Sequence, residues 1–236
     1  ADSLLGYSSI IGARFYGLGN EYMGLLIGAS IITITGIFEL NIGNRYFKWI
    51  FIIFFLFITF LIGYPGLGAN FGGTITVVIT GISTLYYIDK KNISIRLLII
   101  IFSVFFLILY LDYSGLFGKT SHIGRAIQAL LKGDFALIKE IVDRKVMMNV
   151  KLLRWTIWTK VLIGFFICIL VVFRHPVGKL KKLFRDFPYL AAGFYGGLAG
   201  CIITFFVNDS GVVAMATLLF YPIMSLLYII EEYGYN

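Results

Sequence analysis

The sequence predicts an all-α integral membrane protein with about seven transmembrane helices, one amphipathic interfacial helix and a weak internal repeat. Three observations predict this fold class. Apolar residues make up 59% of the 236 residues and charged residues only 14%, whereas a soluble domain carries about 25% charged residues. The mean hydropathy is +0.92. The forty residues between Lys48 and Asp89 carry no charge, which is enough for two membrane-spanning helices.

Seven apolar segments are candidates for spans, because a helix needs about 20 apolar residues to cross the hydrocarbon core. They are residues 21–38, 49–64, 71–88, 97–112, 156–173, 188–207 and 211–230. Within 188–207, glycines at helical spacing predict close helix packing: Gly193, Gly196, Gly197 and Gly200. We interpret residues 1–236 as a single polytopic domain. Because it starts at Ala1 with no Met or signal peptide, we expect a piece of a longer protein.

Residues 113–154 differ from these spans because they mix charges with apolar residues at helical spacing. This pattern predicts an amphipathic helix that lies flat in the membrane interface. Its spacing is carried by Phe135, Ile138, Ile141, Val142, Lys145, Met148, Asn149 and Leu152. A short extra span is the alternative, but it would bury Asp143, Arg144 and Lys145, which is costly.

The positions of Lys and Arg predict the orientation. The loops after the first, third and fifth spans hold two, three and five of these residues, and those after the second and sixth hold none. Loops rich in Lys and Arg face the cytoplasm, which places the N-terminus outside and the C-terminus in the cytoplasm. The eight Lys and Arg residues of 113–154 conflict with this scheme. An odd number of spans within that segment would reverse everything after it.

A weak internal repeat relates the starts of two spans. Asn70-Phe71-Gly72-Gly73 opens the third span, and Asn208-Asp209-Ser210-Gly211 opens the seventh, 138 residues later. The same offset carries the second span onto the sixth and the first onto the fifth, so the copies would run parallel. The similarity is limited to this short pattern and to hydropathy, and chance is the alternative.

On this topology the unusual polar residues gather on the outer side of the membrane. The candidate substrate-binding residues are Arg14, Asn20, Asn70, Gly72, Gly73, Arg125, Asn208 and Ser210, and the candidate catalytic residues of an enzyme are Glu21, Asp209 and His122. Helices that start at Asn70 and Asn208 would direct N–H groups and partial positive charge outward, which favours a phosphate or carboxylate. The glycines permit close approach.

The charged candidates add to this anion site. Arg14 and Arg125 would supply bidentate contacts to the anion. Glu21 and Asp209 are acids near an apolar boundary, where they are expensive unless they are paired or used. They would pair with the arginines, shuttle a proton or bind a cation.

Each candidate also has a simpler structural interpretation. Asn70 and Asn208 are then N-caps, which Asn favours, Arg14 and Glu21 form an interfacial ion pair, and His122 is a satisfied interfacial residue. Glu21, Asp209 and His122 lack the spacing of a metal site, so we expect no metal and no cofactor. The sequence contains no P-loop, Rossmann fingerprint, HExxH, GxSxG or CxxC motif. The basic residues lie in loops between spans, which favours membrane lipids over nucleic acid as partners.

Four segments together resemble a known family: Gly12–Gly24, Gly68–Thr74, Arg144–Trp158 and Asn208–Gly211. The chain is similar to an uncharacterised family of bacterial multi-pass membrane proteins, whose membrane part follows an extracytoplasmic segment like the alkaline-phosphatase superfamily. The resemblance implies a location in the bacterial cytoplasmic (inner) membrane and an attached or associated extracytoplasmic domain. It implies no established activity for the membrane part, and these residues contain no phosphatase metal motif.

Three functions are compatible with these patterns. The leading hypothesis is a transport or lipid-handling module of the bacterial envelope, which holds an anionic group, such as a lipid-linked phosphate, in a polar pocket open to the outer leaflet. The second is a membrane-embedded transferase or hydrolase acting on a lipid-linked substrate, with Glu21 or Asp209 as general base and His122 as acid. The third is a non-catalytic anchor or scaffold for an extracytoplasmic domain.

Overall fold

The computed structural model describes an all-helical chain. The described residues are 17–40, 46–64, 66–89, 99, 103, 106, 107, 110, 114, 133–174 and 177–233, and they contain no strand. Their helices are α1 (Asn20–Glu39), α2 (Phe47–Gly63), α3 (Phe71–Ile88), α6 (Phe135–Trp155), α7 (Ile157–Arg174), α8 (Val177–Asp186), α9 (Pro188–Val207) and α10 (Gly211–Tyr233). The all-α prediction is confirmed for this part of the chain.

Four of these helices are long and apolar enough to cross a membrane, namely α1, α3, α9 and α10. The count becomes five when α6 and α7, which meet at a bend of 79°, are taken as one broken span. The helix α2 is apolar but has only 17 residues, or about 25 Å. The structure is therefore compatible with a multi-pass membrane protein, and it does not confirm the count of seven. The expected span 97–112 lies mostly outside the described residues.

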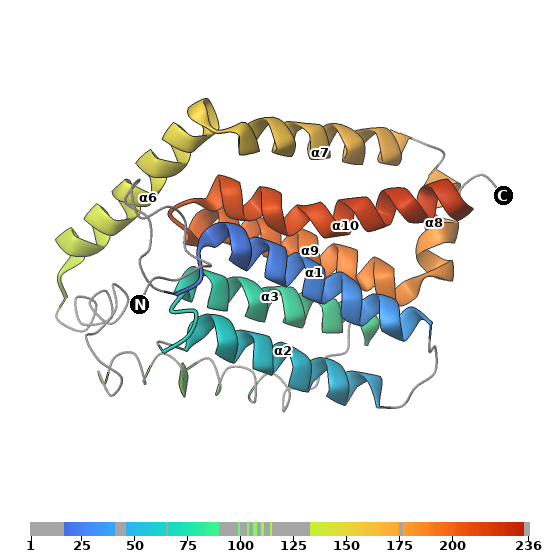
Figure 1. Cartoon of the computed structure of the whole chain (residues 1–236), viewed down its shortest axis with the longest axis horizontal. Coiled ribbons are helices and arrows are strands. Elements are labelled where there is room, and N and C mark those ends of the chain that lie inside the picture. The colour runs from blue at the N-terminus through green and yellow to red at the C-terminus, as the bar shows by residue number, and fades with distance from the viewer. Residues whose placement is uncertain are drawn as a thin grey trace.

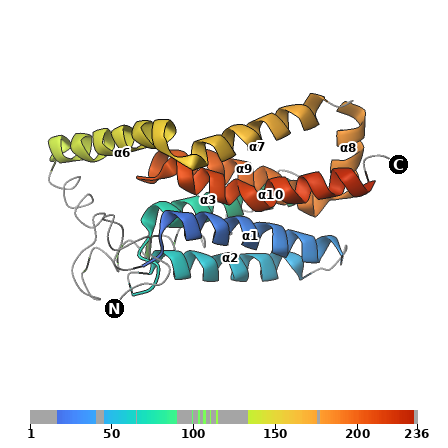
Figure 2. The ribbon, with the colours of Figure 1, turned by 45° about the horizontal axis from the view of Figure 1, so that its top comes forward.

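The long helices form an antiparallel bundle. The helices α1, α3 and α10 run in one direction, and α2 and α9 run in the other (Figures 1 and 2). At the centre α1 packs along α10 and α3 along α9, around fully buried side chains such as Met23, Ile27, Phe51 and Leu218. The parallel course of α3 and α10 agrees with the direction expected for the internal repeat.

Glycines of α9 pack against threonines of α3, as the spacing in 188–207 predicts. A Cβ atom added to Gly196 would lie 1.9 Å from Oγ1 of Thr84, and one added to Gly200 would lie 2.1 Å from Oγ1 of Thr80. These hydroxyls donate to carbonyls one turn earlier, at 2.8 Å in both cases. They are therefore satisfied within α3, and the two backbones approach closely because α9 has no side chain there.

The helix α6 stands apart from the bundle. Most of its side chains are exposed, while Ile141, Lys145 and Leu152 are half-buried and Asn149 is buried. This face repeats every three to four residues, so a helix is present within 113–154. Phe135, Val142 and Met148, which the expected spacing included, are exposed. The helix ends at Trp155, and α7 turns away at Thr156 to pack along α10 (Figure 2).

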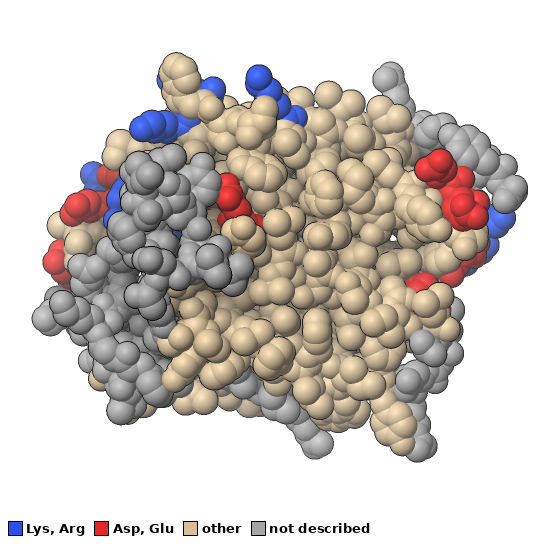
Figure 3. Space-filling model, in the orientation of Figure 1, with Lys and Arg blue, Asp and Glu red and all other residues tan. Residues whose placement is uncertain are grey.

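On the face in Figure 3 the acids lie toward the two ends of the bundle, cations also lie along the upper edge, and the surface between them carries no charged residue. At the end where α1 finishes, Lys48 of α2 pairs with Asp89 at the end of α3. Glu39 is buried there, and its Oε2 accepts a hydrogen bond from the backbone N–H of Leu190 at 2.9 Å. Such a carboxylate stabilises the start of α9.

Candidate functional site

The first part of the candidate site is the turn between α2 and α3, which Asn70 organises. Its Nδ2 donates to the carbonyl of Leu18 and to Oδ1 of Asn20, both at 3.0 Å. Its Oδ1 accepts from the backbone N–H of Gly73 at 2.9 Å. Asn70 therefore caps α3 and also ties that turn to the start of α1, so the N-cap interpretation is confirmed.

Glycine brings this turn against the segment that joins α9 to α10. A Cβ atom added to Gly72 would lie 2.2 Å from Oδ1 of Asn208, and one added to Gly73 would lie 2.6 Å from Cγ of Met23. Both positions are buried at the first turn of α3. The two polar turns that the sequence placed 138 residues apart therefore touch directly.

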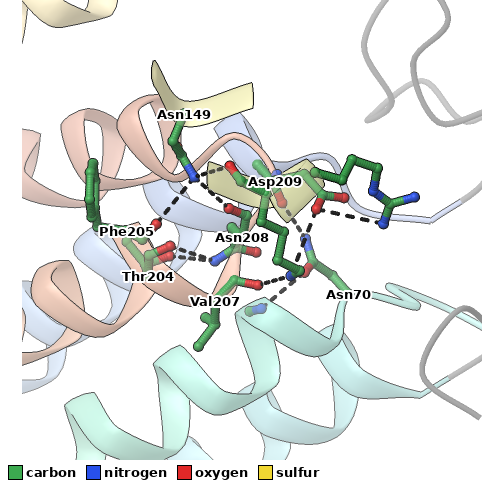
Figure 4. Close-up of polar contacts among 11 residues, drawn as sticks. Asn70, Asn149, Thr204, Phe205, Val207, Asn208 and Asp209 are labelled. Atoms are coloured by element: carbon green, nitrogen blue, oxygen red, sulfur yellow. Dashed lines mark hydrogen bonds and ion pairs between the residues drawn. The ribbon is translucent and has the colours of Figure 1, made fainter. Parts of the chain in front are cut away.

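The segment between α9 and α10 is held by a second asparagine, Asn149 of α6. Its Nδ2 donates to the carbonyl of Asn208 at 3.2 Å, and its Oδ1 accepts from the backbone N–H of Val212 at 3.2 Å (Figure 4). One side chain thus satisfies a carbonyl left over at the end of α9 and an N–H group left over at the start of α10.

Asn208 behaves differently from the expected helix start. The helix α10 begins at Gly211, and the Nδ2 of Asn208 points back along α9, where it donates to the carbonyl and Oγ1 of Thr204 at 3.1 and 2.7 Å. It follows the last residue of α9 and is that helix's C-cap. The prediction that Asn208 is an N-cap is therefore wrong, because residues 208–210 form a turn between the end of α9 and the start of α10.

The charged part of the site comes from α6 and Asp209. Oδ1 of Asp209 lies 3.7 Å from Nζ of Lys145 and 3.9 Å from Nη2 of Arg144. Lys145 also donates to the carbonyl of Val207. Asp209 and Arg144 are about half exposed, and loose pairs of this kind contribute at most about 1 kcal/mol each. Two cations therefore lie near one carboxylate.

The structure brings together many of the residues that the sequence singled out. Asn20 bonds Asn70, Gly73 is capped by Asn70, Gly72 touches Asn208, and Asp209 and Ser210 follow in the same turn. Glu21 lies half-buried in the first turn of α1, whose N-cap Gly19 supplies no side-chain hydrogen bond. Arg14, His122 and Arg125 lie outside the described residues.

Three residues of the site were not among the candidates: Arg144, Lys145 and Asn149. A signal for two of them is present in the sequence, because Lys145 and Asn149 are four residues apart on the inner face of an amphipathic helix. Polar groups on such a face require partners when the face is buried. Their partners here are backbone groups of the α9–α10 turn.

Comparison with known proteins finds no matching family model, no similar curated protein and no similar solved structure. Among the described residues, no group of three or more His, Cys, Asp and Glu side chains is arranged to hold a metal ion. The function is therefore argued from the geometry of the two turns and α6.

Proposed function

We propose that this chain is a membrane module of the bacterial envelope that binds an anionic group, such as a lipid-linked phosphate, for transport or lipid handling. The observation that supports this proposal is the position of Arg144 and Lys145. Both cations reach the turn where α9 ends and α10 begins, and this turn contacts the start of α3.

The charge balance of this turn favours an anion. Among the described side chains of this turn, Arg144 and Lys145 carry two positive charges and Asp209 one negative charge. The start of α10 adds partial positive charge and the end of α9 partial negative charge, so the two helix ends offset each other. A guanidinium has five N–H donors, and the contact of Arg144 with a described acid is the distant one to Asp209. A phosphate would make the shorter, charge-assisted hydrogen bonds that Asp209 does not make.

The asparagines have a supporting role in this proposal. In both Asn70 and Asn149 the amide nitrogen and the amide oxygen form hydrogen bonds within the protein. We therefore expect these side chains to hold the turns in place and not to contact the ligand. Glu21 and Asp209 are the acids that would couple binding to a proton or cation. Asp209 would have a second effect, because it competes with the anion for the same two cations.

A binding measurement with farnesyl monophosphate, a short lipid-linked phosphate, tests this proposal on the purified chain in detergent. We expect Arg144→Gln to weaken binding about tenfold or more, because a hydrogen bond between charged groups contributes about 1.5–3 kcal/mol. We expect Asp209→Asn to strengthen binding, because it removes the competing carboxylate.

Arg154→Gln is the matched control, since Arg154 is also an exposed arginine of α6 and its loss changes the net charge equally. It should bind as the parent chain does. Equal affinities for the Arg144 and Arg154 variants would show that binding follows overall charge, and would contradict the proposed site.

A further inference from the structure

The short helix α8 lies at the opposite end of the bundle from the candidate site. It runs across the ends of α9 and α10 and connects α7 to α9 (Figures 1 and 2). Its ten residues include one acid, Asp186, and four cations: Lys179, Lys181, Lys182 and Arg185. The net charge of this helix is therefore +3, from four positive charges and one negative.

In the part of α8 whose side chains are described, residues 182–186, the charges and the apolar residues lie on different faces. Leu183 is buried and Phe184 half-buried against the bundle, whereas Lys182 and Arg185 are exposed. An amphipathic helix with cations on its polar face is typical of a helix that lies at a membrane surface. Leu183 and Phe184 already pack on the protein. We therefore expect membrane contact through the cations of α8 and through the surface beside these two side chains.

An apolar cleft lies beside that face. It is bounded by α8, α9 and α10 and is lined by Leu183, Phe184, Ala191, Phe194, Pro222 and Leu226, among others. Among the described residues that line it, Ser225 is the one polar side chain. The cations of α8 and this cleft therefore present, next to each other, a place for a negative headgroup and a place for hydrocarbon.

Acids at the same end do not cancel the cations. Oδ1 of Asp186 is 3.7 Å from Nε of Arg185, and both side chains are well exposed, so this pair is weak. Glu231 and Glu232 are exposed near the end of α10, and no ion pair joins either of them to Lys182 or Arg185. The exposed cations of α8 are therefore open to an external anion.

We propose that α8 and the cleft beside it form a binding site for an anionic phospholipid of the surrounding bilayer. The phosphate lies against Lys182 and Arg185, and one acyl chain lies along the mouth of the shallow cleft between α8, α9 and α10. The cations and the cleft together suit an amphipathic lipid, because such a lipid needs a charged contact for its headgroup and an apolar contact for its acyl chain. This site is independent of the anion site at the other end of the bundle.

Native mass spectrometry of the purified full chain tests this site. We expect dioleoyl phosphatidylglycerol to be retained more strongly than dioleoyl phosphatidylcholine. A variant with Lys182→Gln and Arg185→Gln should lose about twenty-five-fold in its affinity for phosphatidylglycerol, since each cation near an anionic lipid surface contributes about fivefold. Ala191→Leu should also weaken retention, because a larger side chain fills the cleft while the cations stay in place.

The control variant carries Lys151→Gln and Arg154→Gln, which are exposed residues of the other amphipathic helix, α6. It removes the same charge and should retain phosphatidylglycerol as the parent chain does. Equal retention by the α8 and α6 variants, or equal retention of the two lipids by the parent chain, would overturn the proposal. Loss of retention in the α8 variant with unchanged retention in Ala191→Leu would overturn its acyl-chain half.

Discussion

At the scale of single residues, Asn149 carries an unusual share of the hydrogen bonding. Its amide bonds the last carbonyls of α9 and a first-turn N–H of α10, and it is buried. Every one of these partners belongs to the backbone. Asn149 thus replaces the separate caps that two helix ends normally need, and it fixes α6 to the bundle at the same time.

We predict that Asn149→Leu, which keeps the size of the side chain, destabilises the fold by about 1–3 kcal/mol, because it leaves buried backbone groups unsatisfied. The measurement is the thermal unfolding midpoint in detergent, together with the rate of proteolysis within α6. Met148→Leu is the control, since Met148 is the exposed neighbour. An unchanged midpoint for Asn149→Leu would show that the site does not depend on this cap.

Single residues also show where sequence analysis succeeds. Asn70 was predictable as a cap, because an asparagine before a Gly-Gly start is local information and its Oδ1 bonds a group three residues away. Asn208 was not, because its conformation depends on Thr204 behind it and on Asn149 from a distant helix. The bond of Asn70 to Gly73 depends on the local chain, whereas the bond of Asn149 to Asn208 depends on how α6 packs against the α9–α10 turn.

At the scale of elements, Gly196 and Gly164 allow the effect of helix packing on stability to be distinguished from the effect of helix propensity. Gly196 of α9 faces Thr84, and a Cβ atom there would also lie 2.9 Å from the backbone carbonyl of Thr80. Gly164 of α7 has nothing within 4 Å of such an atom. The same substitution should therefore have opposite effects at the two positions.

We predict that Gly196→Ala destabilises the chain by about 1–3 kcal/mol, since α3 and α9 must move apart. Gly164→Ala should stabilise it by about 0.5–1 kcal/mol, because alanine is the better helix former. Unfolding midpoints of the two variants in the same detergent decide the matter. A loss of stability in both would show that α7 packs against something at Gly164, and no loss in either would contradict the close α3–α9 contact.

The boundaries of elements were largely predictable, and their neighbours were not. Hydropathy placed the segments that became α1, α2, α3, α7, α9 and α10 to within a few residues, because long apolar runs bounded by charges leave little choice. Periodicity also identified the amphipathic helix that became α6. Neither signal says which helix packs on which, and so the contact of Lys145 and Arg144 with Asp209 was missed.

At the scale of the whole molecule, the two ends of the bundle differ in chemistry. One end holds the asparagine-rich turns and the starts of α1, α3 and α10. The other holds α8, the buried Glu39 and the ends of α1 and α3. The middle of the face in Figure 3 carries no charged residue, as expected for a bundle whose middle contacts hydrocarbon.

This arrangement predicts that the two ends lie on opposite sides of a membrane. The turns at Leu67 and Asp209 hold no Lys or Arg and α8 holds four, so the positive-inside rule places the turn at Leu67 outside and α8 inside. Arg144 and Lys145 of α6 lie at the same end of the bundle as the Leu67 turn and oppose this orientation. In a background with Cys168→Ala and Cys201→Ala, Leu67→Cys should react with a membrane-impermeant maleimide added to intact cells. Lys182→Cys should react only after the membrane is opened, and both positions are exposed.

Two further positions guard this result against local effects. Asp209→Cys should label like Leu67→Cys, because the two turns meet at the same end of the bundle. Asp186→Cys should label like Lys182→Cys, because both belong to α8. Opposite labelling with the two ends exchanged would keep the spanning bundle and reverse its orientation, which would place the proposed anion site on the cytoplasmic side. Labelling of all four positions from one side would contradict a bundle that crosses the membrane at all.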